Sequence, residues 1–183
     1  TRVEWINAPD PRVPSGVRPS LYTIIPGRDS SRTFWIISHI DVVPPGDLSL
    51  WASDPFTLRH EPENDPDLIF GRGVEDNQQG VVSSLLAGLA CLELKRAPAV
   101  NLGLMFVADE ENNSEFGVDY ILKNHQELFK DNDIILVPDF GNAEGSLVEV
   151  AEKSVLWLKF TVHGKQCHGS TPDKGINSLV AAS

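Results

Sequence analysis

Three short apolar runs, separated by stretches with helical spacing, constrain the fold of this 183-residue chain more than any other feature. They span Thr33–Ser38, Leu102–Ala108 and Ile134–Val137. A run that is apolar on both faces is typical of a strand buried in a parallel sheet. A further apolar stretch, Leu21–Ile25, predicts an edge strand before the turn at Pro26-Gly27.

Two helices are predicted between these strands. The apolar residues of the first follow the i, i+3, i+4, i+7 spacing of an amphipathic helix from Gln79 to Leu94, and they are Val82, Leu85, Leu86 and Leu89. A second helix is expected between roughly residues 115 and 130. Strands that alternate with helices indicate an α/β fold, so we expect a mostly parallel, mixed and twisted sheet with helices on both faces.

The character of the sequence changes after Gly145. Residues 154–163 alternate well enough to predict a strand, a polar loop follows, and a helix begins at Asn177. We therefore expect a first domain over residues 1–150 and the beginning of a smaller α+β domain over residues 151–183. The absence of an initiator Met and the unfinished last helix predict that residues are missing on both sides.

Composition excludes several functional classes. The formal net charge is −11 and the pI is about 4.8, which argues against binding to nucleic acid or to an anionic membrane. An acidic total is typical of a solvated surface, and it also fits carboxylates neutralised by bound cations. Cys91 and Cys167 form no CxxC spacing, so a disulfide framework is not expected and a cytoplasmic location is predicted. No segment reaches the roughly 18 consecutive apolar residues of a membrane span.

Residues suited to metal binding follow each apolar run, and one more lies in the loop before the first helix. These residues are His39, Asp41, Asp76, Asp109, Glu110, Glu111 and Asp139. One acidic residue after a strand is usually part of a turn or an N-cap. However, ligands bind outside the carboxyl ends of the strands in open α/β sheets, so this set predicts a metal site at one sheet edge. Imidazole together with carboxylates favours zinc over magnesium or calcium.

The spacing within this set suggests a division of roles. His39 and Asp41 are two residues apart on one strand end, so their side chains point the same way and Asp41 can orient the imidazole. Glu110 and Glu111 are adjacent and diverge, so that one can bind metal while the other takes a proton from water.

Five segments in this order resemble one family of enzymes. They are SHIDVVPPGDLSLWASDPF, FGRGVEDNQQG, ADEENNSEFG, VPDFGN and GKQCHGSTPDKGINSL, spread over residues 38 to 179. Together they resemble the di-zinc aminoacylase family, which includes acetylornithine deacetylase, succinyl-diaminopimelate desuccinylase, carboxypeptidase G and related dipeptidases. The resemblance implies a hydrolase that cleaves the amide bond of N-acyl amino acids or small peptides.

The resemblance also implies a metal-binding set. In it, His39 and Asp139 bind the first zinc, Asp76 bridges both ions, and Glu111 binds the second. Two zinc ions per subunit are implied, with cobalt or manganese as possible replacements. A His that completes the second site and a substrate-binding Arg are implied downstream of Ser183. The 183-residue stretch alone is therefore expected to bind one metal better than two and to be nearly inactive.

Three catalytic roles follow from the same resemblance. Glu110 is the general base that activates the attacking water, and Asp41 orients a zinc ligand. His168 lies in the expected lid or dimerisation domain and stabilises the oxyanion, commonly in the active site of the partner subunit, so a homodimer is implied. Asn77 and Gln78 depart from the acidic or Met residue and the Lys that are common in the family, which leaves the substrate subclass open.

Two other functional classes compete with the hydrolase. A non-catalytic binding or dimerisation module would keep the fold, but it would have no use for a base such as Glu110 beside a metal. A nucleotide-binding α/β protein is disfavoured because GRGVED does not satisfy GxGxxG and no GxxxxGK[ST] is present. The remaining histidines are expected on the surface or in packing, and they are His60, His125 and His163.

Overall fold

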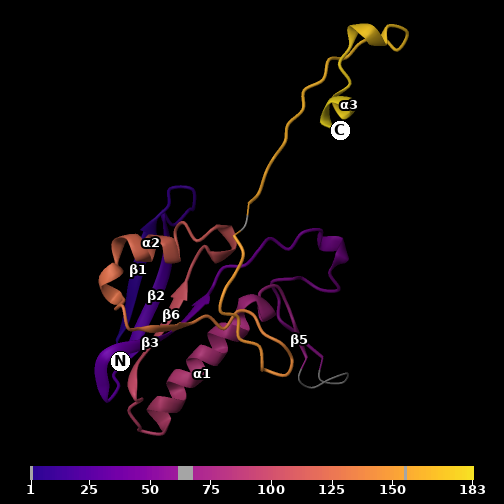
Figure 1. Ribbon diagram of the computed structural model, residues 1–183. Coiled ribbons are helices and arrows are strands. Elements are labelled where there is room, and N and C mark those ends of the chain that lie inside the picture. Colours follow the sequence, from indigo (N-terminus) through magenta and orange to yellow (C-terminus); the bar gives the residue numbers. More distant parts are fainter. Residues whose placement is uncertain (1, 62–67, 155) are drawn as a thin grey trace. The chain divides into compact units, whose positions relative to one another are not determined.

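The computed structural model describes residues 2–61, 68–154 and 156–183 of the chain (Figure 1). It divides into two compact units, Thr1–Leu147 and Val148–Ser183. Unit 1 contains the sheet and every candidate metal-binding residue, whereas unit 2 contains His168. Among the described residues, none of the helices has both the length and the apolar character needed to cross a bilayer.

Unit 1 is built on a five-stranded sheet with the strand order β1-β2-β6-β3-β7 (Figure 1). The strands are β1 (Val3–Pro9), β2 (Val17–Ile25), β3 (Asp29–His39), β6 (Val100–Val107) and β7 (Ile134–Leu136). β3 runs parallel to both of its neighbours, while β2 is antiparallel to β1 and β6. The predicted mixed α/β fold is therefore confirmed.

The N-terminal part of the sheet differs from the prediction. Leu21–Ile25 belongs to β2, which pairs with β1 on one side and β6 on the other. The expectation of an edge strand at this position is wrong, because β1 had not been predicted from the sequence. β1 shows the alternation of a strand with one buried face, since Ile6 and Ala8 are buried between more exposed neighbours.

Both faces of the sheet are covered by a helix, as predicted. On one face Trp35, Ile37, Met105 and Val107 form a cluster with Ile121 of α2 (Val118–Asn124). On the other face Ile36, Leu102, Leu104 and Phe106 form a cluster against α1 (Gln79–Glu93). Successive strand residues alternate between these clusters because the side chains of a strand point to opposite faces in turn.

Helix α1 packs on the sheet through the face opposite to the predicted apolar stripe. Its buried residues are small and four apart, namely Gly80, Ser84 and Gly88. The predicted apolar stripe Val82, Leu85, Leu86 and Leu89 is instead exposed in the described chain. Small residues let the helix backbone approach the strands closely: a Cβ added at Gly88 would lie 2.8 Å from Leu104 Cδ1, and the hydroxyls of Ser84 and Ser38 are 3.1 Å apart.

Two further predictions need correction. The run Ile134–Val137 is not buried, because β7 pairs only with residues 34–36 of β3 and its own side chains remain largely exposed. The helix expected over residues 115–130 is shorter. It comprises α2 and one 3₁₀ turn, Gln126–Leu128, since the chain leaves helical geometry at His125.

No strand or helix was predicted between residues 38 and 79, and the long segment between β3 and α1 contains little regular structure. A two-stranded ribbon pairs β4 (Arg59–His60) with β5 (Ile69–Phe70), and residues 62–67 of the same segment lie outside the described residues. Short helical turns occur in this segment at Leu48–Leu50 and Val74–Gln78, and another, Glu110–Asn112, follows β6.

Unit 2 contains little regular structure. Lys165 bridges to Ile176 in antiparallel fashion around the 3₁₀ turn Pro172–Lys174, and α3 (Ser178–Ala182) follows. The helix predicted to begin at Asn177 is confirmed, and the Asn177 side chain caps it by accepting hydrogen bonds from two backbone N–H groups. The strand predicted over residues 154–163 is absent from the described part of that range.

Asp133 fastens the segment before β7 to β3. It accepts hydrogen bonds from the backbone N–H of Thr33 at 2.6 Å and from Nε1 of Trp35 at 3.1 Å. Burial raises the pKa of Asp133, but these hydrogen bonds and that from the Lys130 backbone outweigh burial, so the pKa lies below its ordinary value. The carboxylate therefore stabilises the folded state.

We expect Asp133→Asn to lower the free energy of unfolding by about 1–3 kcal/mol at neutral pH, because a charged acceptor of buried donors is lost. A depressed folded-state pKa contributes stability above the unfolded-state value of about 3.9, and this contribution is lost as the pH falls through the folded-state pKa. Urea unfolding across this pH range should show the two proteins converging in acid. Asp131→Asn, an exposed neighbour, is the control and should match the wild type at every pH.

Candidate metal centre

The candidate residues meet at the carboxyl ends of the central parallel strands. His39 is the last residue of β3 and pairs with Val107, the last residue of β6. The chain beyond β6 therefore delivers Glu110 and Glu111 next to His39, as expected for an open α/β sheet. Asp76 comes from the turn before α1. Gly73 opens that turn with φ 84°, where a Cβ would lie 2.6 Å from Val42 Cγ1.

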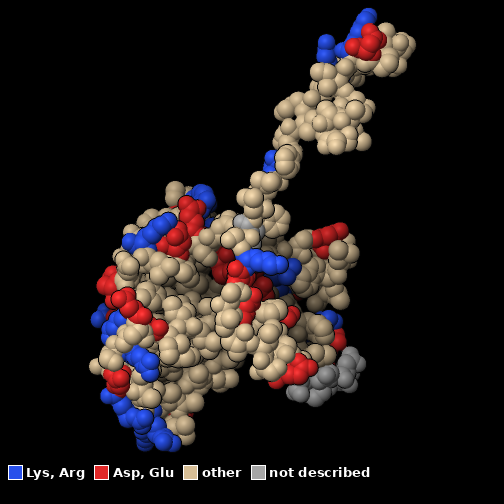
Figure 2. Space-filling view, viewed as in Figure 1, with Lys and Arg blue, Asp and Glu red and all other residues tan. Residues whose placement is uncertain are grey.

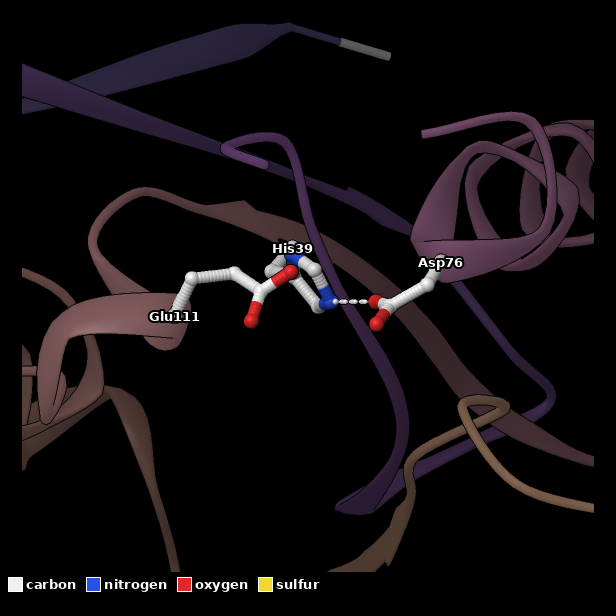
Figure 3. Close-up of side chains that lie close together, drawn as sticks. All are labelled: His39, Asp76 and Glu111. Atoms are coloured by element: carbon white, nitrogen blue, oxygen red, sulfur yellow. Dashed lines mark hydrogen bonds and ion pairs between the residues drawn. The ribbon is translucent and has the colours of Figure 1, made fainter. Parts of the chain in front are cut away.

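Three of the predicted metal-binding residues form one compact group. Ligand atoms of His39, Asp76 and Glu111 all lie within 4.8 Å of one another. Figure 3 shows Asp76 and Glu111 approaching the imidazole from opposite sides. The His39 side chain is 2% exposed and the Asp76 side chain 61%, so the group is anchored in the core on one side and open to solvent on the other.

The hydrogen bonds of His39 determine which ring nitrogen is available. Nδ1 lies 3.0 Å from the backbone carbonyl oxygen of Asp41. A carbonyl oxygen only accepts, so Nδ1 carries the proton and donates it. In the neutral imidazole Nε2 then has a free lone pair, yet Nε2 lies 2.8 Å from Oδ1 of Asp76. Two acceptors this close repel one another unless a second proton or a cation lies between them.

Electrostatics favours a positive charge at this point. Burial lowers the pKa of His39, but the Asp41 carbonyl and the nearby carboxylates of Glu110 and Asp139 outweigh burial, and the pKa is raised above its ordinary value. Figure 2 shows acidic side chains gathered in a recess near the centre of this face of unit 1. The surroundings of His39 are thus suited to a proton on the imidazole or to a bound cation.

Asp41 lies beside His39, but its carboxylate has a different partner from the predicted one. Oδ1 is 3.6 Å from Nδ1 of His39, and the backbone carbonyl of Asp41 makes the closer contact. The two carboxylate oxygens instead accept hydrogen bonds from the backbone N–H groups of Glu110 at 3.0 Å and Glu111 at 3.2 Å. Asp41 therefore orients the imidazole through its main chain and the two glutamates through its side chain.

Glu110 projects toward the same centre without joining the compact group. Its Oε2 lies 3.9 Å from Nε2 of His39. Burial raises the pKa of Glu110, the neighbouring Asp139 and Glu111 raise it further, and the opposing effect of His39 does not reverse the shift. A carboxylate with a raised pKa binds protons more strongly than an exposed one, which suits a general base.

Asp139 also lies close to His39. Its Oδ1 is 3.7 Å from Nε2 of His39 and accepts a hydrogen bond of 2.6 Å from Nδ2 of Asn77. Asn77 is buried and follows Asp76 through a cis peptide bond. This departure from the family pattern, noted in the sequence, thus has a structural role: the amide ties the Asp76 turn to Asp139.

The donor set fits a cation. Oε1 of Glu111 is buried and accepts no hydrogen bond from the residues that the structure describes. A buried carboxylate oxygen without a partner is costly, and a metal ion would satisfy it. One imidazole and several carboxylates form a ligand set of the kind that zinc takes in hydrolases.

His168 lies in unit 2, where the predicted loop forms a tight turn. Its Nδ1 is 2.8 Å from the hydroxyl of Ser170, and its carbonyl accepts a hydrogen bond from the backbone N–H of Thr171. This turn presents an exposed imidazole.

Sequence reasoning assigned no role to a buried ion-pair network behind the glutamates. It consists of Asp10, Arg18 and Asp109, whose two carboxylates are both fully buried. Asp109 had been seen only as one of several acids after a strand. The other two residues lie outside every strand and helix predicted from the sequence, so no local pattern linked them to the site.

Comparison with known proteins agrees with this site. The profile of the peptidase family M20/M25/M40 matches residues 35–169. An uncharacterized metallohydrolase of Methanocaldococcus jannaschii is 50% identical over 157 residues, which cover 85% of this chain and 37% of that protein. A succinyl-diaminopimelate desuccinylase of Paracoccus denitrificans is 29% identical over 157 residues, which cover 85% of this chain and 40% of the relative.

Solved structures support the fold. The crystal structure of human carnosine dipeptidase 1 is similar with a TM-score of 0.62 at 23% identity, over 76% of this chain and 29% of that one. The chain therefore spans less than half the length of these relatives. The family profile covers most of the chain, including every segment that contributes to the metal centre. The resemblance inferred from the five sequence segments is thus confirmed, and the chain belongs to the peptidase family M20/M25/M40.

Proposed function

We propose that this protein is a zinc-dependent hydrolase that cleaves the amide bond of N-acyl amino acids or small peptides. One observation carries the proposal. Nε2 of His39 lies 2.8 Å from Oδ1 of Asp76, while Nδ1 donates its proton to the backbone carbonyl of Asp41. Oε1 of Glu111 is buried and has no hydrogen-bond partner among the described residues, which favours a cation over a second proton between His39 and Asp76.

Similarity supports the substrate class. The family is one of peptidases, and relatives are named for a desuccinylase and a dipeptidase. These activities share one chemistry, the hydrolysis of an amide bond in a small substrate. Desuccinylation and deacetylation of an amino acid are therefore the reactions that we propose to test first. A non-catalytic binding module is the alternative, and the position of Glu110 disfavours it.

We propose His39, Asp76, Glu111 and Asp139 as the metal ligands. Two zinc ions are proposed for each subunit, and these residues would hold them; cobalt or manganese could replace zinc. Zinc bound here would supply Lewis acidity, which polarises the scissile carbonyl and favours ionisation of water.

The residues of the chain supply the proton transfers and the orientation. Glu110 accepts a proton from the attacking water and returns it to the leaving amine. Asp41 holds Glu110 and Glu111 in position by accepting hydrogen bonds from their backbone N–H groups. His168 is proposed to stabilise the oxyanion from a second domain, in a homodimeric cytoplasmic enzyme.

Loss of the Asp76 carboxylate should weaken metal binding strongly. We expect Asp76→Asn to weaken zinc affinity by more than the roughly 10- to 100-fold that removal of an outer-shell partner causes. Calorimetric titration of the metal-free complete protein measures this. Glu75→Gln, which neutralises an adjacent exposed acid outside the compact group, should leave affinity unchanged. Equal affinities in the two variants would overturn the ligand assignment.

Loss of the proposed base, Glu110, should lower the rate of hydrolysis without changing metal binding. We expect Glu110→Gln to lower kcat by about 10²- to 10⁴-fold, because general base catalysis is lost, while zinc content stays at the wild-type level. Glu115→Gln, an exposed acid of the same loop, is the matched control and should retain activity. A fully active Glu110→Gln protein would rule out this role for Glu110.

A substrate panel with and without a chelator tests the reaction itself. The complete protein should hydrolyse at least one member of a set of N-succinyl and N-acetyl amino acids and dipeptides. Activity should disappear with a chelator and return with added zinc. Binding of these compounds without turnover would support the alternative of a binding module, and turnover that persists in a chelator would contradict a metal-dependent reaction.

A further inference from the structure

The chain reaches the two active-site glutamates through a residue with an unusual backbone. Asp109 lies in the left-handed region with φ 66° and ψ 19°, and it is fully buried. Residues other than glycine adopt this conformation rarely, and it persists only where surrounding contacts hold it. The contacts that hold Asp109 therefore also set the direction in which Glu110 and Glu111 leave the strand.

The carboxylate of Asp109 is held from two sides. Oδ2 accepts a hydrogen bond of 2.9 Å from the backbone N–H of Phe116, which closes the loop that carries the glutamates. Oδ1 lies 3.1 Å from Nη1 of Arg18, a residue of the neighbouring strand β2. The loop is thus attached to the sheet by an ion pair.

Arg18 is fixed in turn by a second buried carboxylate. Its Nε donates a hydrogen bond of 2.8 Å to Oδ2 of Asp10, which is fully buried. Hydrogen bonds from Arg12 hold the pKa of Asp10 well below its usual range despite its burial, so Asp10 remains charged. Because the planar guanidinium of Arg18 engages Asp10 and Asp109 through different nitrogens, it sets the spacing of the two carboxylates.

We propose that Arg18 is a positioning residue for the metal centre: by tying Asp109 to Asp10, it holds the turn that presents Glu110 and Glu111. The inference rests on the metal-binding and catalytic roles proposed above for the two glutamates. Arg18 does not belong to the compact group of His39, Asp76 and Glu111. It acts through the backbone of Asp109, as a supporting residue does for a preorganised site.

Arg12 provides a matched comparison. Like Arg18, it donates to Asp10 at 2.8 Å, and both guanidinium groups lie over the ring of Phe116, at 4.6 Å and 5.8 Å from its centroid. Arg12 also donates its backbone N–H and Nη2 to Asp10. Among the described residues, Arg18 lies 3.1 Å from Asp109, whereas Arg12 is more exposed and has Glu115 at 3.9 Å as its second acidic neighbour. If Arg18 only stabilised the fold, its loss would lower the free energy of unfolding without a specific effect on zinc affinity or on the loop that carries Glu110 and Glu111.

The test compares Arg18→Met, Arg18→Lys and Arg12→Met in the complete protein. For Arg18→Met we expect zinc affinity, measured by calorimetry, to fall about 10- to 100-fold. We also expect faster amide exchange over residues 109–117 and a lower kcat at nearly unchanged KM. Arg18→Lys should fall in between, because an ammonium group cannot serve both carboxylates through separate nitrogens. Arg12→Met should lose less zinc affinity than Arg18→Met, because Arg12 contacts Asp10, Glu115 and Phe116 but makes no ion pair with Asp109 among the described residues.

Equal losses of zinc affinity in Arg18→Met and Arg12→Met, or no loss in Arg18→Met, would overturn the proposal. If Arg18→Met does not fold, the comparison of Arg18→Lys with Arg12→Met decides in the same way. The variant Glu111→Gln distinguishes failure of the proposed metal-ligand set from failure of the role proposed for Arg18. Unchanged zinc affinity in that variant would refute the proposed ligand set, and this proposal with it. Weakened affinity in Glu111→Gln with normal affinity in the Arg18 variants would refute the role of Arg18 alone.

Discussion

The parallel pairing of β3 with β6 is the constraint on which the rest of the structure depends. Its register places His39 opposite Val107, so that one strand ends in the imidazole where the other releases the chain toward Glu110 and Glu111. A slip of one residue would turn every side chain of the slipped strand to the other face. The same pairing separates the two apolar clusters that pack against α1 and α2. Core packing and the geometry of the site are therefore set by a single register.

The helix α1 extends this constraint to Asp76. Its buried face is made of Gly80, Ser84 and Gly88, so the distance between helix and sheet is set by backbone atoms in near contact. Asn77 lies against the same end of the helix, where a Cβ on Gly80 would collide with its side-chain oxygen. The turn that carries Asp76 is thus held between the helix, the sheet and Asp139.

The sequence predicted which residues meet at the site better than it predicted the packing around them. His39, Asp76 and the two glutamates could be recognised because each lies directly after a strand or before a helix, and both are local patterns. The buried face of α1 was predicted wrongly because periodicity marks where large apolar residues lie, whereas this sheet accepts small ones. The exposure of β7 follows from its position at the edge of the sheet, and the sequence of one strand does not show where in the sheet that strand lies. The contacts between Arg18 and Asp109 join distant segments and leave no spacing to detect.

The origin of the site from separate segments has a consequence for the lifetime of the protein. His39 and Asp76 are 37 residues apart, and Asp41 and Glu111 are 70 apart, so an unfolded chain would have to close large loops to hold a cation. A cation that binds at this centre would therefore favour the folded state almost exclusively. At a free concentration 100 times its Kd, it would add about 2.7 kcal/mol to the free energy of unfolding. The supply of metal would then govern resistance to proteolysis as well as turnover.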